Sequence, residues 1–105
     1  MILRMWRAQT TAEKADEYIQ HATKKVFPSL LAIAGYRGAY LLRRSQNDTV
    51  ELIVLTLWES VEAVRKFAGP QLNRAVVEPE ARAALTSFDD FATHFDVICA
   101  PETDA

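Results

Sequence analysis

A histidine and an arginine near opposite ends of the chain are the residues best suited to acid–base chemistry. His94 lies in a segment that reads as a strand, FATHFDVI (91–98), with Asp96 two residues after it. Arg4 lies in the first strand-like segment, ILRMWRAQ (2–9). An imidazole titrates near neutral pH and acts as a general base when a carboxylate orients it or a guanidinium steadies it. We therefore predict His94 and Arg4 as candidate catalytic residues. The alternative is that His94 is a structural residue whose hydrogen bonds are satisfied inside a dimer interface.

Aromatic side chains could form the walls of a binding pocket. Pockets for small molecules are lined mostly by apolar and aromatic groups, which suits a flat organic ligand. The candidate substrate-binding residues are Trp6, Trp58, Phe67, Tyr36 and Tyr40. The alternative is that these aromatics simply belong to the core.

The sequence lacks the residue patterns of several common sites. Two histidines and one cysteine without close spacing do not make a usual zinc site. Three glycines are too few for a phosphate-binding loop, and there is no nucleophile elbow. Asp89 and Asp90 are adjacent, so their side chains should diverge and mark a corner of the fold rather than an acid–base pair. No metal or cofactor is predicted.

Length and composition predict one small domain. The chain has 105 residues, of which 50% are hydrophobic and 25% charged, as in an ordinary globular domain. We expect this domain to span residues 1–100 and a short disordered tail to follow at 101–105. The net charge of −2 speaks against a nucleic-acid partner, which needs a basic patch.

The expected location is the cytoplasm, with no membrane partner. The apolar runs are far shorter than the ~20 residues of a membrane span, and the N-terminus lacks the long apolar region of a signal peptide. Cys99 is alone, so no intrachain disulfide can form, and a reducing compartment is the natural assumption.

Four strands and two main helices must position the candidate residues. The predicted strands are 2–9, 36–44, 50–58 and 91–98. A helix between the last two should begin at Ser60 as its N-cap and end at Gly69, and Pro79 should start a further short helix. The order β-α-β-β-α-β is that of a ferredoxin-like α+β fold, with a four-stranded antiparallel sheet and helices on one face.

The first helix shows three signals of its own. Thr10 and Glu13 have the spacing of a capping box, so the helix should begin there. His21 lies opposite the apolar stripe and is expected in solvent. Pro28 should end the helix or begin an irregular turn.

The third predicted strand is apolar on both faces, which predicts a second copy of the chain. Its two parities are Ile53, Leu55 and Leu57, against Val50, Leu52, Val54 and Trp58. Helices cover only one face of such a sheet, so the other would expose more apolar surface than monomers usually do. We predict a homodimer paired sheet against sheet. The alternative is that residues 70–90 fold over that face.

Alternation along the strands indicates which side chains share a face. Those expected towards the helices are Leu3, Met5, Leu55, Leu57, Phe95 and Val97. Those expected on the face shared with the partner are Arg4, Trp6, Thr56, Trp58, His94 and Asp96. Buried charges need partners, so Arg4 is expected to pair with Asp96. On this arrangement, Asp in place of Val54 or Leu52 should split the dimer.

Four motifs resemble those of antibiotic biosynthesis monooxygenase (ABM) type domains in the dimeric α/β-barrel superfamily. They are LWES-VEAVRKFAG, TTAEKADEYI, GYRGAYLLRR after Pro28, and FDDFATHFDVI, and they span about residues 2–98. The resemblance implies a dimeric α/β barrel. It leaves the reaction open, because the superfamily includes cofactor-free oxygenases of polycyclic phenols, heme-degrading enzymes, muconolactone isomerase-like proteins and many members with no assigned reaction.

The heme-degrading branch fits this chain poorly. The resemblance implies an Asn on the first strand, and a Trp and a His in the second helical region. This chain has no Asn between Met1 and Gln9, has Phe67 where that Trp falls, and has no His between Glu59 and Thr93. Heme degradation by that mechanism is therefore not expected.

The predicted function is that of a homodimeric, cofactor-independent monooxygenase acting on a small aromatic or phenolic substrate. The resemblance implies an electron-rich phenol that itself reduces oxygen, with His94 or Arg4 stabilising or deprotonating the phenolate. Trp6, Trp58 and Phe67 would form the walls. Two alternatives stay open. One is a non-catalytic small-ligand-binding or stress-associated protein of the same fold, and the other is a purely structural dimerisation module.

Overall fold

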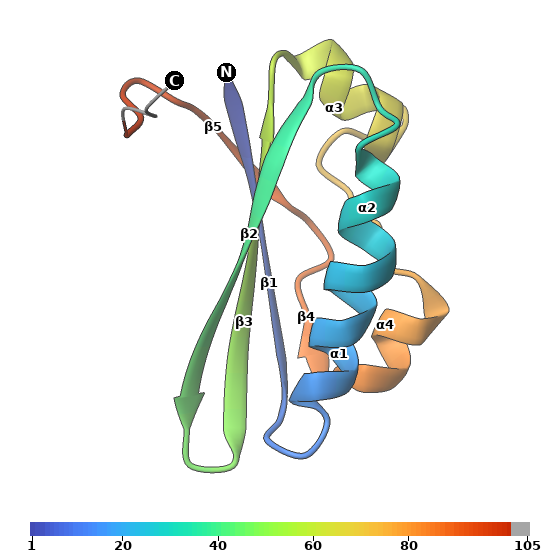
Figure 1. The fold of residues 1–105 in the computed structure, drawn as a ribbon, viewed down its shortest axis with the longest axis vertical. Helices are drawn as coiled ribbons and strands as arrows, with labels where there is room; N and C mark the ends of the chain where they lie inside the picture. The colour runs from blue at the N-terminus through green and yellow to red at the C-terminus, as the bar shows by residue number, and fades with distance from the viewer. Residues whose placement is uncertain (102–105) are drawn as a thin grey trace.

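The computed structural model describes residues 1–101, so the predicted tail lies outside the described residues from 102 onward. In chain order the elements are β1 (Ile2–Thr11), α1 (Ala15–His21), the π-helical turn η1 (Ala22–Val26), α2 (Phe27–Leu30), β2 (Tyr36–Gln46), β3 (Thr49–Trp58), α3 (Val61–Ala68), α4 (Pro79–Ala84), β4 (Ser87–Phe88) and β5 (Thr93–Asp96). The helices lie on one side of the sheet (Figure 1).

The sheet is antiparallel and ferredoxin-like, as predicted. Its order is β2-β3-β1-β4, and β5 also pairs with β1. The predicted last strand, 91–98, is shorter in the structure, where β5 covers only Thr93–Asp96. A two-residue strand that was not predicted, β4, pairs with the same strand β1, so the sheet has five strands instead of the expected four. The chain leaves the sheet between β4 and β5 because its backbone bonds elsewhere: Ala75 N–H donates to the Asp90 carbonyl at 2.9 Å, and Ala92 N–H donates to the Asn73 carbonyl at 2.7 Å.

The first helical segment departs from two predictions. Thr10 belongs to β1 and its hydroxyl donates to the Ala84 carbonyl at 2.6 Å, so the expected capping box does not form. Pro28 does not end the helix: α1, η1 and α2 follow one another without a break (Figure 1). A π-helical turn precedes the proline, with Phe27 N–H bonded to the Ala22 carbonyl. In this wider turn each hydrogen bond spans one residue more than in an α-helix, and the turn lies just before Pro28, which has no backbone N–H to donate.

The local signals around α3 and α4 are confirmed. The Ser60 hydroxyl accepts the Ala63 N–H at 3.2 Å, which caps the first turn of α3. Gly69 follows α3 with a φ of 82°, a conformation that glycine adopts without a steric cost. Pro79 is the first residue of α4, where its missing N–H is not needed.

The two faces of the sheet are the reverse of the predicted assignment. Arg4, Thr56 and Trp58 are buried beneath the helices, and Trp58 packs in one cluster with Leu30 of α2 and Val64 of α3. By alternation, the opposite and uncovered face carries Leu3, Met5, Ile53, Leu55, Leu57 and Phe95. The prediction grouped the side chains of each strand correctly into two alternating sets. Both sets of β3 are apolar, however, so hydrophobicity alone did not indicate which face the helices cover.

Residues 70–90 do not cover the exposed face of the sheet. They lie on the side of the helices, where α4 packs against α1. This rules out the alternative in which they fold over the other face. Leu52 is fully buried within the core that α4 and α1 share, and Val54 packs against it. Asp at either position would disrupt the core, so neither substitution tests the dimer as first expected.

Gly35→Ala is expected to destabilise the fold much more than Gly69→Ala. Both glycines have positive φ, 94° and 82°. A Cβ at Gly35 would lie 2.5 Å from the Cβ of Ala63, whereas a Cβ at Gly69 meets nothing within 4 Å. Backbone strain of roughly 1–3 kcal/mol applies to both, and the collision adds about 1–3 kcal/mol at Gly35 alone. Urea unfolding of the two variants measures the difference, and equal losses would contradict the collision.

Candidate active site

A cavity of about 70 Å³ lies between the sheet and the helices. The strands contribute Arg4 and Trp6 from β1, and Val54 and Thr56 from β3. Arg4 pairs with Thr56 and Trp6 with Val54 across the two strands, which places all four side chains side by side on one face. The helical segment contributes Tyr18, His21, Val26, Phe27 and Leu30, and α3 contributes Phe67. Ala75, Val76, Glu78 and Ala81 close the remaining side.

Arg4 is the buried cation of this site. Its Nη1 donates to the Leu72 carbonyl at 2.7 Å and its Nη2 donates to the Arg74 carbonyl at 2.9 Å. Its guanidinium lies 5.5 Å from the centre of the Phe67 ring. Burial lowers the pKa of Arg4 to about 10, which leaves the side chain charged at neutral pH. The expected pair with Asp96 is wrong, because the strand register places Asp96 opposite Ile2.

His94 lies behind Arg4 and is not among the side chains that line the cavity. Its Nε2 is 3.0 Å from Nη1 of Arg4, and its Nδ1 is 3.1 Å from Oδ1 of Asn73. Burial, and then the charge of Arg4, lower the pKa of His94, so the neutral imidazole is favoured. With Nδ1–H donating to Asn73 and Nε2 accepting from Arg4, both ring nitrogens are engaged.

The five predicted aromatics separate into three groups. Trp6 and Phe67 line the cavity. Trp58 is fully buried behind Phe67, with the two rings stacked 5.6 Å apart, and Tyr36 lies edge-on to Trp58 at 5.3 Å. Tyr40 is opposite Leu55 in the strand register, exposed on the uncovered face of the sheet and outside the cavity.

Tyr18 and His21 were not among the predicted site residues, although both line the cavity. Burial raises the pKa of Tyr18 to about 12. His21 was expected in solvent and is instead buried, because α4 packs along α1 and covers that side. Its position three residues after Tyr18 was the available signal, since residues three apart share one side of a helix.

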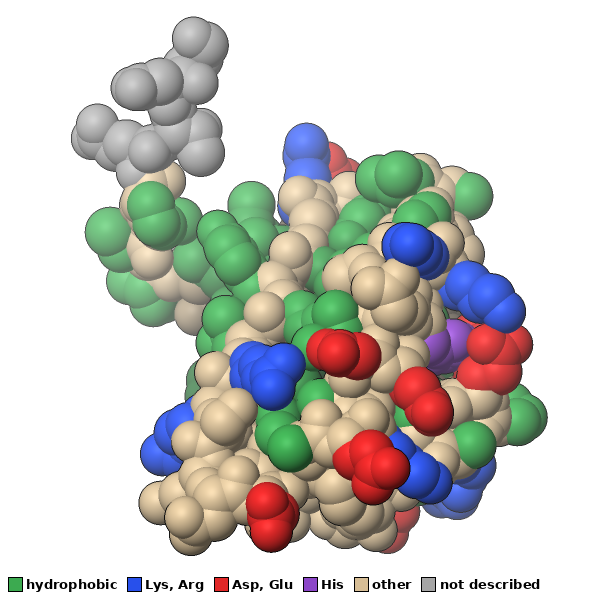
Figure 2. All heavy atoms as spheres, turned by 60° about the horizontal axis from the view of Figure 1, so that its bottom comes forward, with side chains coloured by type: hydrophobic (Ala, Val, Ile, Leu, Met, Phe, Trp, Pro, Cys, Tyr) green, Lys and Arg blue, Asp and Glu red, His purple; other side chains and the backbone are tan. Residues whose placement is uncertain are grey.

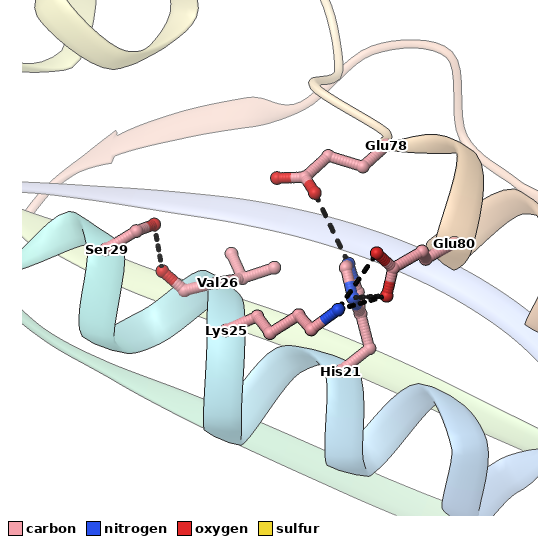
Figure 3. Close-up of polar contacts among 6 residues, drawn as sticks. All are labelled: His21, Lys25, Val26, Ser29, Glu78 and Glu80. Atoms are coloured by element: carbon pink, nitrogen blue, oxygen red, sulfur yellow. Dashed lines mark hydrogen bonds and ion pairs between the residues drawn. The ribbon is translucent and has the colours of Figure 1, made fainter.

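His21 lies between two glutamates at the start of α4 (Figure 3). Its Nδ1 is 3.3 Å from Oε2 of Glu80, and its Nε2 is 3.9 Å from Oε2 of Glu78. Neither nitrogen has a hydrogen-bond partner among the described residues. Figure 2 brings this end of the molecule forward and shows acidic side chains spread over it.

Within residues 1–101, no three His, Cys, Asp or Glu side chains converge as a metal-ion site requires. In the same part of the chain, no helix is both long and apolar enough to cross a membrane.

A family model identifies the family of this chain, and two solved structures share its fold. The model of the antibiotic biosynthesis monooxygenase family matches residues 1–79. A candidate antibiotic biosynthesis monooxygenase from Bacillus cereus has a similar structure, with a TM-score of 0.67 and 13% identity over 97% of both chains. The heme degrader MhuD of Mycobacterium tuberculosis, solved with two hemes in its active site, gives a TM-score of 0.62 and 20% identity over 97% of this chain and 100% of that one. No curated protein matches.

Proposed function

Since this chain belongs to the antibiotic biosynthesis monooxygenase family, we propose that it is a homodimeric, cofactor-independent monooxygenase that acts on a small phenol. The observation that carries the proposal is the cavity beneath the helices, whose walls are apolar and aromatic and whose buried cation is Arg4. An electron-rich phenol would itself reduce oxygen, so the protein has to bind it, favour its phenolate and exclude water.

The size of the cavity favours a substrate with one ring. A cavity of about 150 Å³ admits benzene, and pockets for larger ligands begin at roughly 300 Å³. At about 70 Å³ this cavity requires its cover to move outward even for a single ring. The cover is residues 75–78, which form neither helix nor strand and include the exposed Val76.

Arg4 and the aromatic walls have distinct roles in this proposal. The Arg4 guanidinium supplies positive charge near the ring of a phenolate, over which the negative charge is delocalised, in a water-poor site where such charge acts strongly. Trp6 and Phe67 contact the ring, while Trp58 stacks behind Phe67 and Tyr36 packs edge-on against Trp58. His94 acts as a positioning residue, because its Nε2 contacts Arg4 and not the cavity.

The uncovered face of the sheet supports the homodimer. It exposes 56% of Tyr40, 43% of Leu42 and 47% of Phe95, around the half-buried Leu55 and Leu57. Hydrophobic side chains gather on the left of Figure 2, the side of the sheet away from the helices. A patch of this kind is typical of an interface, and a two-fold pair of sheets would bury it. Cys99 is an exposed free thiol, which favours a cytoplasmic location.

The heme-degrading neighbour raises a second candidate, a protein that binds a small ligand without turning it over. Heme itself fits poorly, because β1 carries no Asn and Phe67 stands where that branch has Trp. The small volume of the cavity favours a smaller molecule for either function.

Oxygen uptake separates the two functions. Aerated protein mixed with one-ring hydroquinones and catechols is expected to consume oxygen above the buffer rate, as measured with an oxygen electrode. Equilibrium dialysis of the same compounds measures binding in parallel. Binding without uptake would replace the monooxygenase by the non-catalytic binder. Neither binding nor uptake would leave only a structural dimerisation module.

A further inference from the structure

His21 is the one histidine with unused hydrogen-bonding capacity at the cavity. Its side chain is only 5% exposed, it lines the cavity, and neither ring nitrogen has a hydrogen-bond partner within residues 1–101. Buried polar atoms usually have a hydrogen-bond partner, so two ring nitrogens without one need an explanation. His94 offers no such capacity, because Arg4 and Asn73 occupy its two nitrogens.

A carboxylate and an ammonium hold His21 in a defined state. Lys25 Nζ donates to both carboxylate oxygens of Glu80, at 3.0 Å and 2.9 Å (Figure 3). The hydrogen bond and the charge of Lys25 lower the pKa of Glu80. The resulting carboxylate lies 3.3 Å from Nδ1 of His21, so in the neutral imidazole it favours the tautomer with its proton on Nδ1. In that tautomer Nε2 is an acceptor.

We propose that His21 accepts the hydroxyl proton of a phenol bound in the cavity, with Glu80 and Lys25 as positioning residues. The inference rests on the proposed function, because it assumes a phenolic ligand. The O–H bond breaks, the proton moves to Nε2, and the electron pair stays on oxygen, giving a phenolate and an imidazolium. Glu78, whose Oε2 is 3.9 Å from Nε2, stabilises the imidazolium. No electron leaves the ligand in this step.

The arrangement also orients the substrate. The hydroxyl that ionises lies at the α4 end of the cavity, against His21, and the ring extends towards Phe67 and Arg4. A substrate with a second oxygen across the ring, such as a hydroquinone, would place that oxygen near the guanidinium. The two polar ends therefore favour para-substituted over ortho-substituted dihydroxybenzenes.

The protonation state of bound 4-nitrophenol tests the proposal, because its phenol and phenolate absorb at different wavelengths. At a pH below its own pKa, the compound bound to the native protein is expected to show the phenolate band. His21→Gln is expected to abolish that band, and Glu80→Gln to weaken it severalfold. Glu62→Gln is the matched control: it changes an exposed carboxylate in the first turn of α3, and the band should stay.

Each outcome separates this inference from the proposed function. Equilibrium dialysis that shows binding, with only the neutral phenol in the spectrum, overturns the role of His21 and leaves a phenol-binding protein. A phenolate band of undiminished strength in Glu80→Gln does the same. This test holds even where His21→Gln does not fold, since the Glu80 side chain is 58% exposed and its substitution should leave the fold intact. Failure of the native protein to bind any one-ring phenol overturns both proposals.

Discussion

Leu55→Asp is expected to halve the mass of the particle in solution, from twice the 11.8 kDa of one chain to a single chain. Leu55 lies on β3, between Met5 of β1 and Tyr40 of β2, at the centre of the uncovered apolar face. A carboxylate there would be buried without a partner in a sheet-to-sheet dimer, which costs several kcal/mol. The folded monomer tolerates it, because this face meets solvent. Light scattering measures the mass, and circular dichroism verifies the fold.

Thr49→Asp provides the matched control. Thr49 lies on the same strand and, by alternation, on the same face, but at the exposed hairpin end beyond the apolar residues. The mass of the Thr49→Asp variant is expected to stay that of the dimer. A native protein that scatters as one chain would refute the dimer. A dimer that survives both Leu55→Asp and Leu57→Asp would place the interface elsewhere.

Arg4→Met is expected to abolish phenol binding and oxygen uptake and to cost roughly 2–6 kcal/mol of the free energy of unfolding. The substitution keeps an apolar stem but removes the donors to the Leu72 and Arg74 carbonyls. Each acceptor left without a partner costs about 1–3 kcal/mol when buried. The binding site loses its positive charge and the anchor of its cover together. Urea unfolding and equilibrium dialysis measure the two effects.

Two further variants separate charge from geometry. Arg4→Lys keeps the charge but cannot span both carbonyls with a planar fork, so intermediate losses are expected. Arg65→Met, on an exposed position of α3, should change stability by no more than about 0.5 kcal/mol and leave binding unchanged. Full binding by Arg4→Met would contradict the role of the guanidinium.

Local signals in the sequence predicted the local structure well. Ser60 and Gly69 bound α3 because capping depends on residues within one turn. The strand order followed from hydrophobic runs and connection lengths. The choice of the buried face did not follow, because β3 is apolar on both sides. The buried face also carries Arg4, whose partners are the carbonyls of Leu72 and Arg74, about seventy positions along the chain, so no local signal showed that its charge could be satisfied there.

The candidate site was predicted only in part, because it too depends on contacts between segments that are distant in the sequence. Arg4, Trp6 and Phe67 were identified by type and do line the cavity, although their binding role stays a prediction. His21 was missed because the sequence shows one helix at a time, and α4 covers this residue only after folding. A helix wheel drawn for α1 alone cannot include the neighbour that buries its polar side.

The π-helical turn η1 has a consequence for changes in chain length. His21 and Val26, five residues apart, both line the cavity, whereas in an α-helix residues three or four apart share a side. The turn therefore holds one residue more than an α-helical path needs. Loss of one residue within 22–26 would restore a regular α-helix with the same wall, although a deletion elsewhere in a helix rotates all that follows by about 100°. A one-residue deletion in this turn is thus expected to leave the binding surface in place.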